Sequence, residues 1–285
     1  MNNIYISSLA FWGSTPENMI SEAKDNDFAI EFSSGLPFRE DMEEIYYQAE
    51  IKKIPHNYFP APKVPFVLNL ASKDKLIRER SIEHCIHGLR MSKKSGAPFF
   101  SAHAGFCIDP NPADLGNQLE ISGDFDIEHH KSLFLESVMK ILKESHQLET
   151  DFLLENNVIT RFNLTTEGRN PLLFCESTDI LWLFNELTDN RLGLLLDTAH
   201  LKVSCTTLNK DLNSELDLMS KFIRAIHHSD NDGERDTNTS LTADYWFLKN
   251  MNRYDSLSHV LEVKKLKVSE IKNQIKLLKI WMLKN

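Results

Sequence analysis

The sequence has few of the features that mark secreted or membrane proteins. Its four cysteines lie far apart and form no CxxC pair, which argues against a disulfide framework or a cysteine-based structural zinc site. No apolar run approaches the roughly 20 residues that a membrane helix needs, and residues 1–14 lack the basic segment of a signal peptide. These absences predict a cytoplasmic protein with reduced thiols and no membrane partner.

Basic residues are also fewer than acidic ones. The chain has 32 Lys and Arg against 41 Asp and Glu, a formal net charge of −9. A chain this acidic is a poor electrostatic match for nucleic acid, so nucleic acid is a disfavoured partner. Linkers rich in proline, glycine or serine are missing too, and nothing in the pattern divides the 285 residues. We therefore expect one domain over residues 1–285.

A regular alternation of short apolar runs and longer amphipathic segments fills the chain. The apolar runs predict eight strands, at residues 3–10, 28–34, 51–57, 98–105, 151–156, 192–200, 223–230 and 259–263. Segments between them have helical spacing, as at Phe134, Val138 and Ile141. Eight strand–helix units in one domain favour an α/β fold, a single (β/α)8 TIM barrel. An open doubly wound sheet is the alternative.

Polar side chains end the third to eighth predicted strands. They are His56, His103, Glu155, Asp197, His227 and Glu262. Each has a structural explanation when taken singly, such as capping of the next helix. In a barrel, however, the carboxyl ends of all strands meet at one mouth. Carboxylates packed this closely repel one another, so the convergence of the set predicts a bound divalent cation.

The last four strands supply the predicted metal ligands, Glu155, Asp197, His227 and Glu262. Three carboxylates and one imidazole suit Mn²⁺, Zn²⁺, Co²⁺ or Fe²⁺. His56 and His103 either form a second metal site that shares Glu155 or bind substrate oxygens. His200, expected at the start of the loop after Asp197, is placed for substrate or an outer metal. Residues 102–126 are expected to form a long loop over the mouth.

This set supports three kinds of function. Glu155 and Glu262 come from non-adjacent strands and can flank a small polyol, moving a proton at a carbon next to a carbonyl, which is isomerisation or epimerisation. With two or three metals, the same scaffold favours hydrolysis of a phosphodiester. The third alternative is a sugar-binding barrel without catalytic activity.

Five segments on successive predicted strands resemble the xylose isomerase-like (β/α)8 superfamily: SAHAG, LLENN, LLDTAH, IHHSDNDG and LEV. That group includes sugar isomerases and epimerases and the endonuclease IV-type apurinic endonucleases. The resemblance implies a TIM barrel with a divalent metal held by Glu155, Asp197, His227 and Glu262. Glu155 and Glu262 match the proton-transfer pair of the ketose epimerases, and His200 matches their substrate-binding histidine.

The endonuclease branch is matched only in part. His56 and His103 fit its second metal site, whereas its third site pairs the histidine at 200 with an Asp-x-His motif. Here that motif reads Asp236-Thr237-Asn238, so an imidazole is missing. The resemblance therefore implies a small sugar or sugar phosphate as substrate rather than DNA. Barrels of this kind often pair, which leaves a homo-oligomer open.

Overall fold

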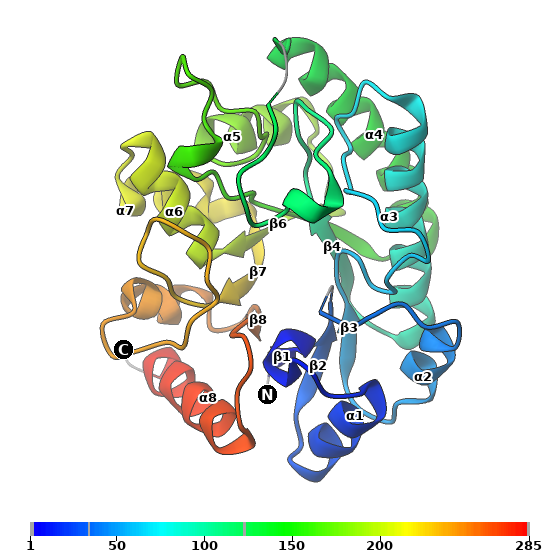
Figure 1. Cartoon of the computed structure of the whole chain (residues 1–285). Coiled ribbons are helices and arrows are strands. Elements are labelled where there is room, and N and C mark those ends of the chain that lie inside the picture. Colours follow the sequence, from blue (N-terminus) through cyan, green and yellow to red (C-terminus); the bar gives the residue numbers. More distant parts are fainter. Residues whose placement is uncertain (1–2, 34, 122–123, 284–285) are drawn as a thin grey trace.

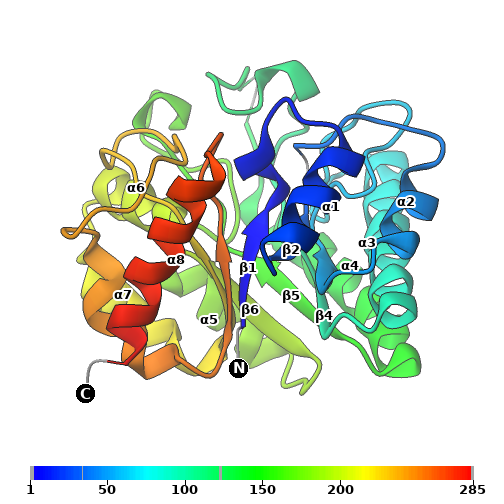
Figure 2. The same ribbon diagram turned by 90° about the horizontal axis from the view of Figure 1, so that it is seen from below.

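Eight parallel strands lie at the centre of the molecule, and helices surround them (Figures 1 and 2). The computed structural model describes residues 3–33, 35–121 and 124–283. The strands are β1 (Ile4–Ser7), β2 (Ala29–Phe32), β3 (Lys53–Pro55), β4 (Phe99–His103), β5 (Asp151–Glu155), β6 (Leu192–Asp197), β7 (Ile223–His228) and β8 (Ser258–Leu261). Their order, β3-β2-β1-β8-β7-β6-β5-β4, brings the two ends of the sheet together, where His56 and Ser101 form an isolated bridge. The prediction of a single (β/α)8 TIM barrel is confirmed, and the open sheet is wrong.

The helices form the outer layer. They are α1 (Pro16–Asp25), α2 (Met42–Gln48), α3 (Lys75–Ser95), α4 (Ile127–Leu148), α5 (Ser177–Glu186), α6 (Thr198–Leu208), α7 (Leu212–Met219) and α8 (Val268–Met282). Short 3-10 helices add η1 (Ser8–Phe11), η2 (Pro112–Asp114), η3 (Arg161–Asn163), η4 (Ser220–Phe222) and η5 (Trp246–Tyr254). Between β7 and β8 the regular element is η5 in place of an α-helix. None of the helices in the described residues has the length and apolar character to cross a membrane.

The sequence patterns account for the individual helices. Thr15 caps α1 by accepting a hydrogen bond from the Asn18 N–H at 3.2 Å, and Pro16 occupies the first turn, where its missing N–H costs nothing. In α4, Phe134, Val138 and Ile141 are all buried, as their spacing predicts.

The barrel interior is filled by one small group of buried side chains. Each strand contributes one residue to this group, and side chains from all eight strands can pack together only inside the barrel. The group consists of Tyr5, Ala29, Ile54, Phe99, Leu153, Leu195, Ala225 and Val260, together with Ala97. A larger apolar cluster contains the other faces of the strands and the inward faces of the helices. The interior is tight, since a Cβ added to Gly193 would lie 2.6 Å from Leu153 Cδ2.

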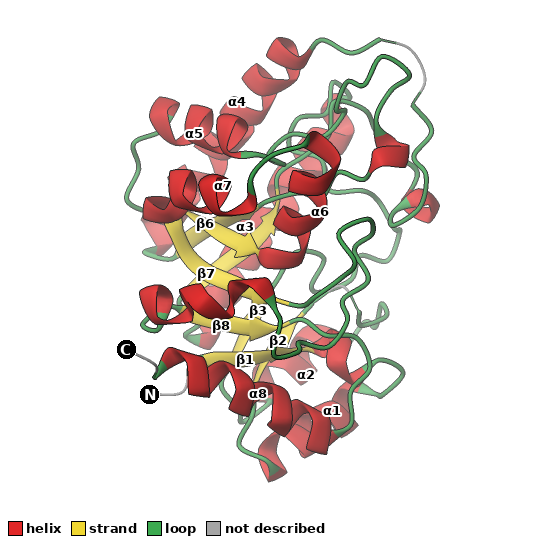
Figure 3. Cartoon of the chain, turned by 90° about the vertical axis from the view of Figure 1, so that its left-hand side faces the viewer, coloured by secondary structure: helices red, strands yellow, loops and turns green. Residues whose placement is uncertain are grey.

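Several strands are shorter than their apolar runs. The run at 3–10 divides into β1 and η1, and the run at 192–200 ends at Asp197, where α6 begins. Residue 34, the last of the second predicted strand, and residues 122–123 of the predicted long loop lie outside the described residues. The longer loops gather at one end of the barrel (Figure 3). Leu115, Gly116 and Leu119 of the 102–126 loop line a cavity there.

Candidate metal centre

The polar residues at the mouth continue the interior rows of the barrel. Side chains two residues apart on a strand lie on the same face. Thus Glu155 follows Leu153 and His227 follows Ala225, both of which point into the barrel. The same spacing of two residues relates five further site residues to interior positions on their strands. They are Glu31 after Ala29, His56 after Ile54, Asp197 after Leu195, Glu262 after Val260 and His103 after Ser101. The period of the strand is therefore what directs these groups to one place.

His227 lies at the centre of the predicted ligand set. Its Nδ1 atom is 3.0 Å from Glu262 Oε2, 3.2 Å from Glu155 Oε1 and 3.8 Å from Asp197 Oδ2. One ligand atom from each of the four residues lies within 4.8 Å of the others. The structure thus brings together the four side chains that the sequence predicts as ligands. His228, the next residue, points outward and contacts Tyr245 and His259, as strand alternation requires.

A second group shares Glu155. Its Oε2 atom is 3.3 Å from His56 Nε2 and 3.4 Å from His103 Nε2, and these three residues also form a candidate ligand set. The other ring nitrogen of His56 lies 2.8 Å from Ser101 Oγ. Burial lowers the pKa of His103 to about 4, so this imidazole is neutral near pH 7 and has a lone pair for a ligand or substrate.

His200 and Asp236 lie beside the cluster and are paired with each other. The expectation of a loop at His200 is wrong: the Asp197 carboxylate accepts hydrogen bonds from the N–H groups of Ala199 and His200, and α6 starts at once. His200 Nδ1–H donates to the Asn156 carbonyl at 2.8 Å, and Nε2 is 3.2 Å from Asp236 Oδ2. Among the described residues, neither belongs to a group of three candidate ligands.

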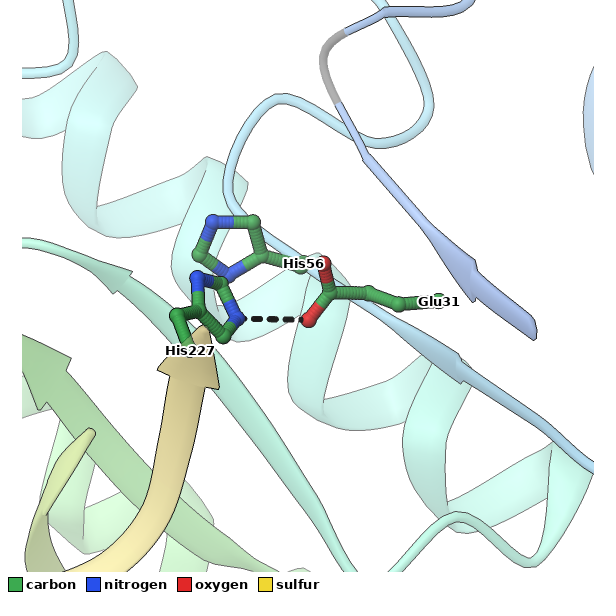
Figure 4. Close-up of side chains that lie close together, drawn as sticks. All are labelled: Glu31, His56 and His227. Carbon is green, nitrogen blue, oxygen red and sulfur yellow. Dashed lines mark hydrogen bonds and ion pairs between the residues drawn. The ribbon is translucent and has the colours of Figure 1, made fainter. Parts of the chain in front are cut away.

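Glu31 is a site residue that the sequence analysis missed. It lies on β2 with its side chain fully buried, and its Oε2 atom is 2.9 Å from His227 Nε2 (Figure 4). Glu31, His56 and His227 form a third candidate ligand group. The sequence does contain a sign of this residue, because Glu31 is a single carboxylate within the apolar run FAIEF. It does not stand at the end of that run, where the other predicted site residues lie.

The charges of the cluster fit a divalent cation. Burial raises the pKa of Asp197 well above its usual value, and the Glu262 and Glu155 carboxylates raise it further. Burial also raises the pKa of Glu155. The nearby imidazoles of His103 and His227 lower this pKa by more, so that it lies well below its usual value. Competition of this kind between close carboxylates is relieved when a cation binds them.

Buried oxygen atoms without donors point the same way. Asp197 Oδ2 is buried and has no hydrogen-bond partner among the described residues, and the His56 and His103 nitrogens that lie 3.3 and 3.4 Å from Glu155 Oε2 are not in hydrogen-bond geometry with it. A buried acceptor without a donor costs about 1–3 kcal/mol, and more when it is charged. A cation held by carboxylates and one imidazole would satisfy these oxygens, and this donor set suits Mn²⁺, Zn²⁺, Co²⁺ or Fe²⁺.

A cavity of about 430 Å³ opens beside the cluster at the mouth. Its polar lining includes His103, His200 and Asp236, and its apolar lining includes Phe106 and Leu172. The volume lies in the range of small-molecule sites.

The family comparison agrees with this architecture. Residues 21–264 match the model of the xylose isomerase-like TIM barrel family, and the chain belongs to that family. A comparison with curated protein sequences gives no significant match.

Solved structures with the same fold include several sugar epimerases. A D-tagatose 3-epimerase-like protein has a TM-score of 0.73 at 14% identity, over 98% of this chain and 96% of that one. D-psicose 3-epimerase from Clostridium cellulolyticum with D-tagatose has a TM-score of 0.65 at 13% identity, over 98% and 97%. A Thermus thermophilus protein soaked with ZnCl2 has a TM-score of 0.66 at 17% identity, over 96% and 97%. At these identities the likeness establishes the shared fold.

Proposed function

We propose that the protein is a divalent-metal-dependent sugar or sugar-phosphate isomerase or epimerase. One observation carries the proposal: Glu155 and Glu262 come from non-adjacent strands, yet both carboxylates lie within 3.2 Å of the same nitrogen of His227. Two groups capable of acid–base chemistry thereby lie at one candidate metal-binding cluster beside a cavity. The named activities of the structural neighbours, D-tagatose 3-epimerase-like and D-psicose 3-epimerase, support this class.

In this proposal, Glu155, Asp197, His227 and Glu262 would hold the metal. A bound divalent cation would polarise the substrate carbonyl and so acidify the adjacent carbon-bound proton. Glu262 and Glu155 would remove that proton and return one. The imidazole of His227 lowers the pKa of Glu262 against the effect of burial, which keeps the carboxylate ionised and able to accept a proton. The Glu262 side chain is 15% exposed and that of Glu155 only 1%, so Glu262 is the more accessible to substrate.

The substrate would occupy the mouth cavity. His103 and the His200–Asp236 pair offer hydrogen-bonding groups to hydroxyls, and Phe106 and Leu172 offer an apolar surface to the C–H faces of a sugar. Arg235 is the one Lys or Arg side chain lining the cavity within the described ranges. It would bind a phosphate if the substrate carries one.

A nuclease of the endonuclease IV type is the weaker proposal. Its third metal site would need an imidazole where this chain has Asn238, and the Asn238 Nδ2 group lies 3.5 Å from Ser229 Oγ. The net charge of −9 also opposes DNA binding.

Hydrogen exchange at carbon tests the proposed function. Protein loaded with Mn²⁺ or Co²⁺ is incubated in D₂O with ketoses such as D-tagatose, D-psicose and D-fructose, and with their phosphates. Deuterium incorporation next to the carbonyl is followed by NMR. We expect exchange with at least one sugar, and its loss by at least about 100-fold in Glu155→Gln and in Glu262→Gln, since general acid–base catalysis contributes about 10²–10⁴-fold.

Glu215→Gln is the matched control. Glu215 is a buried carboxylate on α7 that accepts a hydrogen bond from the Ser177 N–H, and within the described ranges it belongs to no candidate ligand group and does not line the mouth cavity. Its variant should keep full exchange activity. Absence of exchange with every sugar would contradict the proposal. Nicking of abasic duplex DNA would favour the nuclease, and sugar binding without exchange would favour a non-catalytic barrel.

A further inference from the structure

Glu31 is a buried carboxylate whose position inside the barrel is costly. It is fully buried in the interior, and its Oε1 atom has no hydrogen-bond partner among the described residues. Burial of a charge carries a large free-energy cost unless the charge is paired. Its Oε2 atom accepts a hydrogen bond from His227 Nε2 at 2.9 Å across the barrel from β7 (Figure 4). The hydrogen bond to His227 is therefore the interaction that offsets part of the free-energy cost of burying the Glu31 carboxylate.

The two nitrogens of His227 face different surroundings. Nε2 faces Glu31, and Nδ1 faces Glu262, Glu155 and Asp197, the predicted metal ligands. An ionised carboxylate only accepts hydrogen bonds, and a neutral imidazole has one N–H and one lone pair. Carboxylate oxygens lie at hydrogen-bond distance from both nitrogens, Glu262 Oε2 at 3.0 Å from Nδ1 and Glu31 Oε2 at 2.9 Å from Nε2. A cation bound through Nδ1 takes the lone pair of that nitrogen, so the one N–H of the ring is then on Nε2 and is donated to Glu31.

We infer that Glu31 is a positioning residue that fixes the ring orientation and the tautomer of His227, so that Nδ1 serves as the metal ligand. This inference rests on the metal site of the proposed function. Metal-bound histidines commonly donate their second N–H to a carboxylate, and loss of such a partner weakens metal binding by about 10–100-fold.

Direct ligation by Glu31 is the competing assignment. Glu31, His56 and His227 also have ligand atoms within 4.8 Å of one another. However, a metal among these three would need a lone pair on His227 Nε2, whereas a ring that ligates through Nδ1 carries its N–H on Nε2, 2.9 Å from Glu31 Oε2. It would also withdraw His56 Nε2 from Glu155, which lies 3.3 Å away. The positioning role keeps both arrangements intact.

Metal titration of three variants tests the role. Zn²⁺ affinity and stoichiometry are measured by competition with a chromophoric chelator for the wild type, Glu31→Gln, Glu31→Leu and the Glu215→Gln control. We expect Glu31→Leu to bind Zn²⁺ about 10–100-fold more weakly at unchanged stoichiometry. Glu31→Gln should lose less affinity, because its amide oxygen still accepts the hydrogen bond. Glu215→Gln should bind as the wild type does.

An NMR measurement distinguishes positioning from a general effect on the fold. In the Zn²⁺-loaded wild type, the Nε2–H of His227 should exchange slowly with water and Nδ1 should show the ¹⁵N shift of a metal ligand. Glu31→Leu should make this proton exchange faster while circular dichroism stays unchanged. Glu31→Gln preserves the shape of the side chain and gives a folded variant should the leucine protein fail to fold.

Three outcomes would overturn the inference, and they differ from one another. Wild-type affinity in Glu31→Leu would overturn the positioning role alone. Loss of one whole metal equivalent from Glu31→Leu, with the rest bound at wild-type affinity, would make Glu31 a ligand of a second metal. A wild-type protein that binds no metal would refute the metal-dependent function itself and the inference with it.

Discussion

Replacing Asp197 with asparagine should separate its structural role from its predicted role as a ligand. One carboxylate oxygen, Oδ1, accepts the N–H groups of Ala199 and His200 at 2.7 and 2.8 Å and caps α6. The other, Oδ2, is buried without a donor among the described residues and faces the cluster. Asparagine caps helices as well as aspartate does, because its amide oxygen accepts the same bonds. Only the second oxygen is chemically altered.

The magnitudes follow from this division. Without metal, Asp197→Asn should unfold with a free energy at least equal to that of the wild type, since burial raises the pKa of Asp197 and the charged form is costly there. With metal at 100 times its dissociation constant, the wild type should gain about 2.7 kcal/mol. For a chain of this size that is a rise in Tm of about 4–5 °C, and the variant should show almost none of it.

Thermal unfolding in EDTA and in Mn²⁺, Co²⁺ or Zn²⁺ provides the assay. Asp197→Ala serves as the comparison, because it removes both roles and should lose about 1 kcal/mol even in EDTA. A metal-induced shift in Asp197→Asn as large as in the wild type would refute the assignment of Asp197 as a ligand. A large loss of stability of Asp197→Asn in EDTA would refute the division between the two oxygens.

Two further predictions concern the scaffold. Burial lowers the pKa of His259 to about 4 from a usual 6.5. The unfolded chain therefore takes up this proton first as the pH falls, so stability present above pH 6.5 is lost toward pH 4, up to about 3 kcal/mol. Urea unfolding should show a wider stability gap between wild type and His259→Gln at pH 7.5 than at pH 4.5, and a constant gap would contradict this. Gly88→Ala should lose about 1–3 kcal/mol, because its Cβ would lie 2.2 Å from the Phe100 ring. Adding Phe100→Leu should restore part of that loss, and failure to do so would locate the strain elsewhere.

The fold and most of the cluster were accessible from sequence because both depend on short-range periodicity. Glu155 and Asp197 end their strands, His227 is the next-to-last residue of β7, and barrel geometry makes the ends of such strands converge. His228 could be set aside for the same reason, since adjacent residues on a strand face opposite sides.

Other parts of the site depend on contacts that no local pattern records. Glu31 stands inside a strand, and only its partner across the barrel, His227, gives its carboxylate a function. Asp236 lies in the irregular segment before η5, and its place next to His200 is set by long-range packing. His200 was expected in a loop because the continuous apolar run concealed the cap that Asp197 provides.

The joint between β3 and β4 links the integrity of the barrel wall to what the mouth binds. In the described ranges these strands share no regular ladder, only the bridge of His56 with Ser101, where the Asn57 N–H donates to the Ser101 carbonyl at 2.7 Å. His56 is also one of the histidines beside Glu155. A ligand that immobilises His56 would stabilise the His56–Ser101 bridge, and with it the closure of the barrel between β3 and β4. Backbone amides near Asn57 should then exchange with solvent more slowly when a ligand occupies the mouth. Ligand binding would therefore stabilise the barrel against local opening, in addition to any role in catalysis.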